Sequence, residues 1–129
     1  MSTVLVDTHV LHWLSAEPDR LSPRAEETIR GATEIAVSDI SWFELALLAE
    51  RGRLIVSTSI RGWLHALARD VRTVPIAPDI AATAIALPDT FPRDPADRLI
   101  YATAIERGWQ LVTKDDRLHG QREPDPAVW

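Results

Sequence analysis

The stretch Val4-Leu5-Val6-Asp7-Thr8-His9-Val10-Leu11 opens the chain with a short apolar run that leads directly into a helical pattern. Residues 4–6 are rich in β-branched side chains and predict a buried strand. Val10, Leu11 and Leu14 lie on one face of a helix expected over residues 8–16. Asp7 stands at the junction between these two elements. A strand followed directly by a helix is the unit from which α/β folds are built.

The same alternation of strands and helices continues along the chain. Helices are predicted from Ser22-Pro23 to Gly31 and over residues 39–51, 60–70, 78–87 and 94–107, while strands are predicted over 35–37, 73–76, 109–113 and, at the tail, 126–129. The strand over 73–76 should lie at an edge because Pro75 cannot donate to a ladder. We therefore expect an α/β domain with a short, mainly parallel central sheet and helices on both faces.

Length and composition limit the class of protein. A chain of 129 residues predicts one domain, residues 1–129. The absence of cysteine excludes disulfides and thiolate metal sites and suits a cytoplasmic protein. No apolar run approaches the ~20 residues that a membrane span needs, and no targeting segment is visible. The dispersed glycines argue against a nucleotide cofactor. The net charge of −5 argues against a static basic surface for nucleic acid.

Four acidic residues stand beside apolar segments: Asp7, Glu44, Asp97 and Asp115. Each has a structural explanation as a helix cap. Asp7 and Asp115 could cap the turns that follow them, and Ser41 with Glu44 has the spacing of a capping box. Asp94-Pro95-Ala96-Asp97 has the pattern of a helix start. Considered singly, none of the four residues predicts a functional site.

Considered together, the four acids predict a cluster. Loops that leave the carboxyl ends of parallel strands meet at one edge of the sheet, where such folds bind ligands. Carboxylates gathered there must take up protons, stay apart or hold a cation. Oxygen ligands select Mg²⁺ or Mn²⁺, ions that typically support phosphodiester hydrolysis. Four basic residues near the acids could bind a nucleic acid backbone, although solvated surface is the favoured explanation for any one of them: Arg93, Arg98, Lys114 and Arg117.

Four motifs in order along nearly the whole chain carry a family resemblance: Val4-Leu-Val-Asp7-Thr8-His9, Ile40-Ser41-Trp42-Phe43-Glu44, Arg93-Asp94-Pro95-Ala96-Asp97-Arg98-Leu99-Ile100 and Leu111-Val112-Thr113-Lys114-Asp115. With these motifs the chain resembles PIN-domain proteins, specifically VapC-type toxin ribonucleases of type II toxin–antitoxin pairs. The resemblance implies a PIN-like three-layer α/β/α sandwich and cleavage of single-stranded RNA.

The resemblance also assigns roles to residues. Asp7, Glu44, Asp97 and Asp115 would be catalytic; the three aspartates would hold Mg²⁺ or Mn²⁺, and Glu44 would help to position water. Candidate supporting residues are Thr113, Asp94, Asp116, Arg98 and Ser41. The implied partners are an RNA substrate, a second copy in a homodimer, and a cognate antitoxin that inhibits the toxin in a heterotetramer or larger assembly.

Several alternatives remain open from the sequence. The helix over residues 39–51 is apolar nearly all round, which suits either a deep core helix or a surface shared with a partner. His9 and His12 could share a helix face, but a zinc site would need further ligands. Lys114 after a late strand hints at a phosphoacceptor receiver domain, which would want a second acid where Thr8 stands. Another alternative to the nuclease is an interaction protein that has a PIN fold but no catalytic activity.

Overall fold

The computed structural model describes residues 2–129, and across this range five parallel strands form one sheet in the order β3-β2-β1-β4-β5. Its strands are β1 (Thr3–Val6), β2 (Glu34–Ser38), β3 (Arg72–Val74), β4 (Gln110–Val112) and β5 (Ala127–Val128). Leu5 is in register with Ala36 on one side and with Leu111 on the other, so β1 is central. The edge position of the strand predicted over 73–76 is confirmed, but β3 ends at Val74, so Pro75 and Ile76 lie outside it. The described sheet is wholly rather than mainly parallel.

Six α-helices and two short 3₁₀ helices connect the strands within the described residues: α1 (Thr8–Ala16), η1 (Pro18–Arg20), α2 (Pro23–Arg30), α3 (Asp39–Glu50), α4 (Ile60–Ala68), α5 (Pro78–Ala86), α6 (Pro95–Arg107) and η2 (Asp116–Leu118). Local signals in the sequence set several of their ends. The Ser22 side chain caps α2, with Pro23 at its first position. Gly108 ends α6 at φ 69°, a left-handed conformation that favours glycine.

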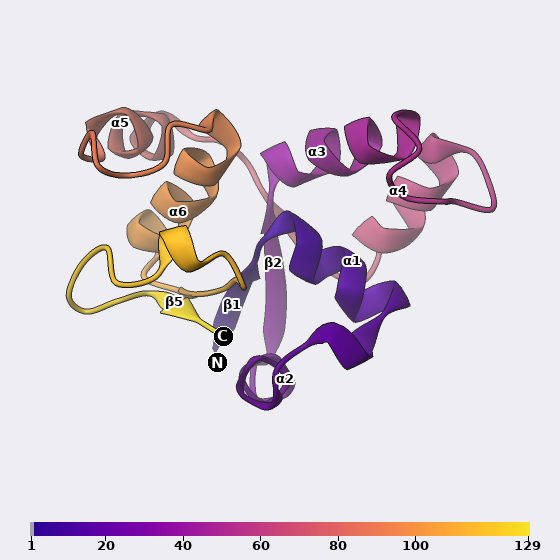
Figure 1. Cartoon of the computed structure of the whole chain (residues 1–129), viewed down its shortest axis with the longest axis horizontal. Helices are drawn as coiled ribbons and strands as arrows, with labels where there is room; N and C mark the ends of the chain where they lie inside the picture. The colour runs from indigo at the N-terminus through magenta and orange to yellow at the C-terminus, as the bar shows by residue number, and fades with distance from the viewer. Residues whose placement is uncertain (1) are drawn as a thin grey trace.

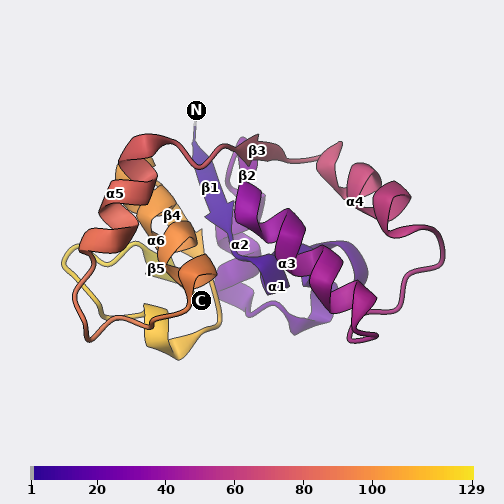
Figure 2. The same ribbon diagram turned by 90° about the horizontal axis from the view of Figure 1, so that it is seen from above.

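Side chains alternate along the strands and fill two separate cores. Leu5 and Leu111 pack on the face covered by α5 and α6. Val4, Val6 and Val112 pack on the opposite face, against α1 and α2. Figure 1 shows α5 and α6 on one side of the strands and α1 on the other, and Figure 2 shows the same separation from above. The three-layer α/β/α sandwich implied by the resemblance is therefore confirmed.

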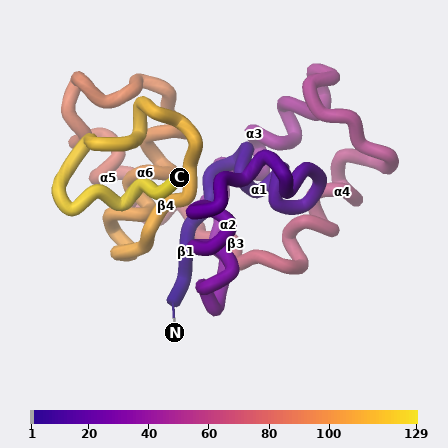
Figure 3. Tube along the Cα trace, turned by 60° about the horizontal axis from the view of Figure 1, so that its bottom comes forward, coloured from indigo at the N-terminus to yellow at the C-terminus, as the bar shows by residue number. Residues whose placement is uncertain are grey.

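Helix α3 is not the deep core helix that its composition allowed. Only Ser41 and Leu45 of this helix are buried, and Phe43 is 64% exposed. The reason is that α3 packs beside α4, as Figure 3 shows, and only the start of α3 reaches α6 and the core beneath it. Its apolar surface is therefore shared between the core, α4 and solvent, which leaves the partner-surface interpretation of Phe43 standing.

Arg98 holds the loop between α5 and α6 in place through hydrogen bonds. Its guanidinium lies near the Phe91 ring, 5.7 Å from the centroid. It also donates to five backbone carbonyls at 2.9–3.3 Å, those of Ala84, Leu87, Pro88, Phe91 and Pro92. Loop carbonyls that lack a helix or sheet partner need such donors when they are partly buried. Arg98 thus fixes the loop that leads into the first turn of α6.

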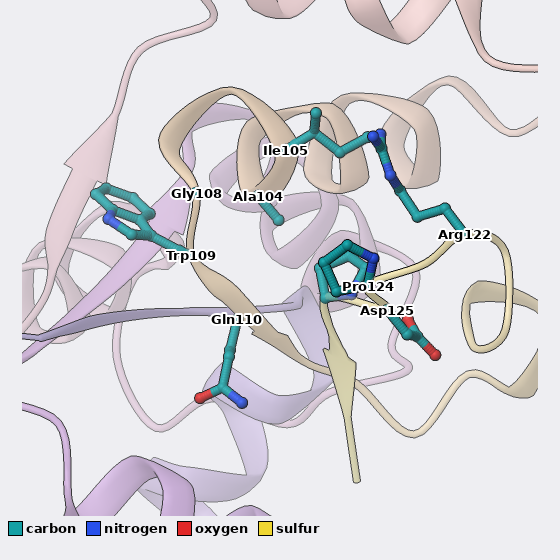
Figure 4. Close-up of a pocket in the computed structure, with 9 residues that line it drawn as sticks. Ala104, Ile105, Gly108, Trp109, Gln110, Arg122, Pro124 and Asp125 are labelled. Atoms are coloured by element: carbon teal, nitrogen blue, oxygen red, sulfur yellow. The ribbon is translucent and has the colours of Figure 1, made fainter.

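Two cavities lie at opposite ends of β4. The one at the amino end, of about 310 Å³, is mostly apolar and lies between the end of α6 and the segment from Arg122 to Pro126. Figure 4 shows its lining, with Arg122 and Asp125 as its charged side chains. The cavity at the carboxyl end holds the predicted acids and is described below. Among residues 2–129, none of the helices has both the length and the apolarity required to span a membrane.

We predict that Arg98→Ala lowers the free energy of unfolding by about 2 kcal/mol, because partly buried carbonyls lose a charged donor. Thermal unfolding measures this loss. Arg93→Ala is the matched control, since Arg93 is an exposed arginine of the same loop. Equal stability of the two variants would contradict the role given to Arg98.

Candidate active site

A cavity of about 480 Å³ opens at the carboxyl ends of β1 and β4. Its lining includes all four predicted catalytic acids. The full lining is Asp7, Thr8, His9, Trp13, Glu44, Asp94, Asp97, Ile100, Lys114, Asp115 and Arg117. Asp7 follows β1, Glu44 lies on α3, Asp97 lies in the first turn of α6, and Asp115 begins η2 after β4. Residues far apart in the chain therefore meet at the sheet edge where ligands bind in such folds.

The two carboxylate oxygens of Asp7 accept hydrogen bonds from different groups. Oδ1 accepts from the backbone N–H of Val10 at 2.9 Å, which caps α1, while Oδ2 accepts from the hydroxyl of Thr113. The capping explanation is thus confirmed without removing Asp7 from the cavity. Burial raises the pKa of Asp7, although the hydrogen bonds from Thr113 and Val10 act against this rise.

Glu44 is held by the residue that follows Asp7. The Thr8 hydroxyl donates to Glu44 Oε1, and the hydroxyl oxygens of Thr8 and Ser41 are hydrogen-bonded at 2.9 Å. The capping-box interpretation of Ser41 is wrong, because α3 begins earlier and Ser38 caps it. Burial, followed by the negative charge of Asp94, raises the pKa of Glu44 above its ordinary value.

Asp97 lies in the first turn of α6 and also has a raised pKa. The start of α6 is as predicted, with Asp94 Oδ1 accepting from the backbone N–H of Asp97 at 3.1 Å. The Asp97 side chain is 20% exposed. Its burial and then the nearby charge of Asp94 raise its pKa to about 6. Asp94 therefore acts on the site both as a helix cap and as a neighbouring charge.

Asp115 is paired with Arg117. The Arg117 guanidinium donates from Nη2 to Asp115 Oδ2 at 2.6 Å and from Nε to Oδ1 at 3.0 Å. The same Nη2 lies 3.2 Å from Asp97 Oδ2. These hydrogen bonds lower the pKa of Asp115 and raise that of Arg117. The two carboxylates are thus bridged by one cation.

The candidate supporting residues divide into two groups. Thr113 and Asp94 reach the site, through Asp7 and Asp97 respectively, while Ser41 lies behind Thr8. Asp116 and Arg98 do not line the cavity; Asp116 is exposed on η2, and Arg98 fastens the loop before α6. The histidines separate as well, because His9 lines the cavity while His12 Nε2 lies 3.4 Å from Glu17 Oε2.

Two contributions were not predicted from the sequence. Thr8, which orients Glu44, stands next to Asp7, but nothing in a single sequence points its hydroxyl at residue 44. Arg117 was expected to be one of several basic residues on the surface, and its bridge to Asp97 depends on contact between η2 and α6. The position of Arg117 two residues after Asp115 was the available signal for the local part of this pairing.

The donor set fits a hard divalent cation. The four predicted acids offer carboxylate oxygens to the cavity, and these are the ligands that Mg²⁺ and Mn²⁺ prefer. Within residues 2–129, no three acidic, histidine or cysteine side chains are arranged to hold an ion as they stand. The Asp97 and Asp115 carboxylates are hydrogen-bonded to Arg117 instead, so metal binding would need side-chain rotation that releases these oxygens.

Comparison with known proteins agrees with this fold. The model of the PIN domain matches residues 4–123. The chain belongs to the PIN-domain family. It is also 60% identical, over 130 residues and the full length of both chains, to Ribonuclease VapC22 of Mycobacterium tuberculosis. The resemblance to VapC-type PIN-domain proteins that the four motifs carry is therefore confirmed.

Solved structures with low sequence identity share the PIN-domain fold. One chain from a toxin–antitoxin complex of Klebsiella pneumoniae has a TM-score of 0.70 and 23% identity, covering 98% of this chain and 96% of that one. A chain of VapBC-5 from Mycobacterium tuberculosis has a TM-score of 0.62 and 20% identity, covering 99% and 97%. At these identities the likeness supports the fold alone.

We predict that Asp97 titrates near pH 6 in chelator-treated protein. Between the ordinary pKa of 3.8 and about 6, the folded state binds a proton that the unfolded state has released. The contribution of Asp97 to the free energy of unfolding should therefore decrease as pH rises across this window. A carboxyl ¹³C NMR titration measures the midpoint. In thermal unfolding, the stability of Asp97→Asn relative to wild type should increase between pH 4 and pH 7. An NMR midpoint at or below pH 4 would contradict the prediction.

Proposed function

We propose that this chain is the toxin of a type II toxin–antitoxin pair and acts in the cytoplasm as an Mg²⁺- or Mn²⁺-dependent endoribonuclease. The observation that carries the proposal is the meeting of Asp7, Glu44, Asp97 and Asp115 at one cavity. The 60% identity to a protein named Ribonuclease VapC22 supports RNA as the substrate. Hydrolysis of the RNA phosphodiester bond is the reaction that such an oxygen-rich site supports best.

Asp7, Asp97 and Asp115 would hold the metal, and Thr113 would orient Asp7. A bound divalent ion would polarise the phosphate and lower the pKa of a bound water. Three carboxylates would lose much of their mutual repulsion on binding it. Their positions on three elements would also fix the place of the phosphate relative to Glu44.

Glu44 would act on the attacking water. Burial raises its pKa toward neutrality, which suits a group that must accept a proton. The Thr8 hydroxyl holds one carboxylate oxygen, so the other is left to receive that proton. The water oxygen would then bond to phosphorus while the bond from phosphorus to the leaving ribose oxygen breaks, and that oxygen would take up a proton from solvent. Lys114 at the cavity rim would attract the RNA backbone.

We also propose a homodimer and a cognate antitoxin that inhibits the toxin, in a heterotetramer or larger assembly. The class of partner to test is suggested by two structures of the same fold, one described as a toxin–antitoxin complex and the other as a member of a family of toxin–antitoxin systems. The acidic cavity would accept a basic side chain of the antitoxin. Phe43, exposed on α3 one residue before Glu44, would provide apolar contact beside it.

We predict that Asp97→Asn abolishes metal-dependent RNA cleavage without unfolding the chain. Total bacterial RNA is incubated with Mg²⁺ or Mn²⁺, and new 5′ ends are mapped by sequencing, so the target need not be known in advance. Loss of a metal ligand at the reaction centre should reduce cleavage by a factor on the order of 10² or more.

Asp89→Asn is the matched control, because it removes the same charge from an exposed loop residue outside the cavity. It should cleave as wild type does. Undiminished cleavage by Asp97→Asn, or by wild type in chelator, would contradict the proposal. Catalytically silent wild-type protein that still binds a partner would instead favour an interaction protein with a PIN fold.

We further predict that Thr113→Val weakens Mn²⁺ binding by about 10- to 100-fold, whereas Thr113→Ser keeps it within a small factor. Valine lacks the hydroxyl that orients Asp7, but its side chain has nearly the same shape as that of threonine. Isothermal titration calorimetry measures the affinity. Equal binding by the valine and serine variants would show that Asp7 does not depend on this hydrogen bond.

A further inference from the structure

Arg117 has an unusual position for an exposed basic residue. Its side chain is 62% exposed, yet all three of its side-chain hydrogen bonds go to carboxylates of the cavity. Two of them form a fork on Asp115, and the third reaches Asp97. Lys114 lies on the same cavity but has a different environment, with Nζ 6.0 Å from the centroid of the Trp13 ring.

The backbone around Arg117 is held in place while its side chain stays accessible. Asp115 Oδ1 accepts from the backbone N–H of Arg117 at 3.0 Å, and the next residue, Leu118, is fully buried. These contacts fix the start of the Arg117 side chain beside the site. The guanidinium itself is largely exposed, so water can solvate it when it leaves its carboxylates.

A divalent cation and the guanidinium would need the same atoms. Asp97 Oδ2 and Asp115 Oδ2, both bonded to Arg117 Nη2, belong to two of the three proposed metal ligands. A compact ion with two charges interacts more strongly with two carboxylates than a delocalised single charge does. Binding of the ion should therefore displace the guanidinium, at least from Asp97.

We propose that Arg117 is a displaceable counter-ion of the acidic site, which bridges Asp97 and Asp115 in the metal-free protein and is released when a divalent metal binds. This inference rests on the proposed metal-dependent function. Before metal binds, the bridge reduces repulsion between the two carboxylates. Once released, the guanidinium remains anchored at the cavity rim by η2, where it can bind a phosphate of the RNA. Arg117 is thus a positioning residue that links metal loading to substrate binding.

The direct test measures Mn²⁺ affinity of the full chain without RNA, by calorimetry, for wild type, Arg117→Gln and Lys114→Gln. Both variants remove one positive charge from the cavity lining, but only the first removes a competitor for the carboxylates. We expect Arg117→Gln to bind Mn²⁺ at least threefold more tightly than Lys114→Gln. Arg117→Lys, which keeps the charge and loses the fork, should bind with an affinity between those of wild type and Arg117→Gln.

A second readout follows the guanidinium itself. The Arg117 Nε–H resonance of ¹⁵N-labelled wild type should shift during a Mg²⁺ titration. The midpoint of this shift should equal the midpoint of metal binding. Equal or weaker Mn²⁺ binding by Arg117→Gln relative to Lys114→Gln, or an unmoved resonance in metal-bound protein, would overturn the counter-ion role and leave the proposed nuclease standing. Absence of Mn²⁺ binding by wild type would overturn both.

Discussion

The burial of several carboxylates near one another, at one edge of a parallel sheet, is the constraint on which the rest of this structure depends. Each of the four acids has a partner that tolerates or offsets its charge: Thr113 for Asp7, Thr8 for Glu44, and Arg117 for Asp97 and Asp115. Burial nevertheless raises the pKa values of Asp7, Glu44 and Asp97. The folded protein thus holds charges close together at a cost that a divalent cation would relieve.

The fold provides this arrangement through its topology. In the described chain, neighbouring parallel strands β1 and β4 end side by side, which brings Asp7 near the turn that holds Thr113 and Asp115. Helices on opposite faces contribute the other two acids, Glu44 from α3 and Asp97 from α6. Arg98 secures the loop that delivers α6, so a residue outside the cavity still helps to determine where Asp97 lies.

Much of the fold was predictable because local signals agree with the tertiary structure. Short β-branched runs, the Ser22-Pro23 start and the Gly108 end all act through nearby backbone. The meeting of the acids followed from the rule for parallel strands. Long-range side-chain contacts were not predictable: Arg98 and Arg117 look alike in sequence, but one binds loop carbonyls and the other binds carboxylates. The exposure of Phe43 likewise depends on where α4 packs, which composition alone does not determine.

The central claim is that Asp7, Asp97 and Asp115 form a divalent metal site at the carboxyl edge of the sheet. An anomalous difference map from crystals grown with Mn²⁺ tests it most directly. We expect a peak in the acidic cavity, within coordination distance of oxygens from these three carboxylates. Crystals that contain ordered Mn²⁺ elsewhere, with no peak among the three aspartates, would contradict it.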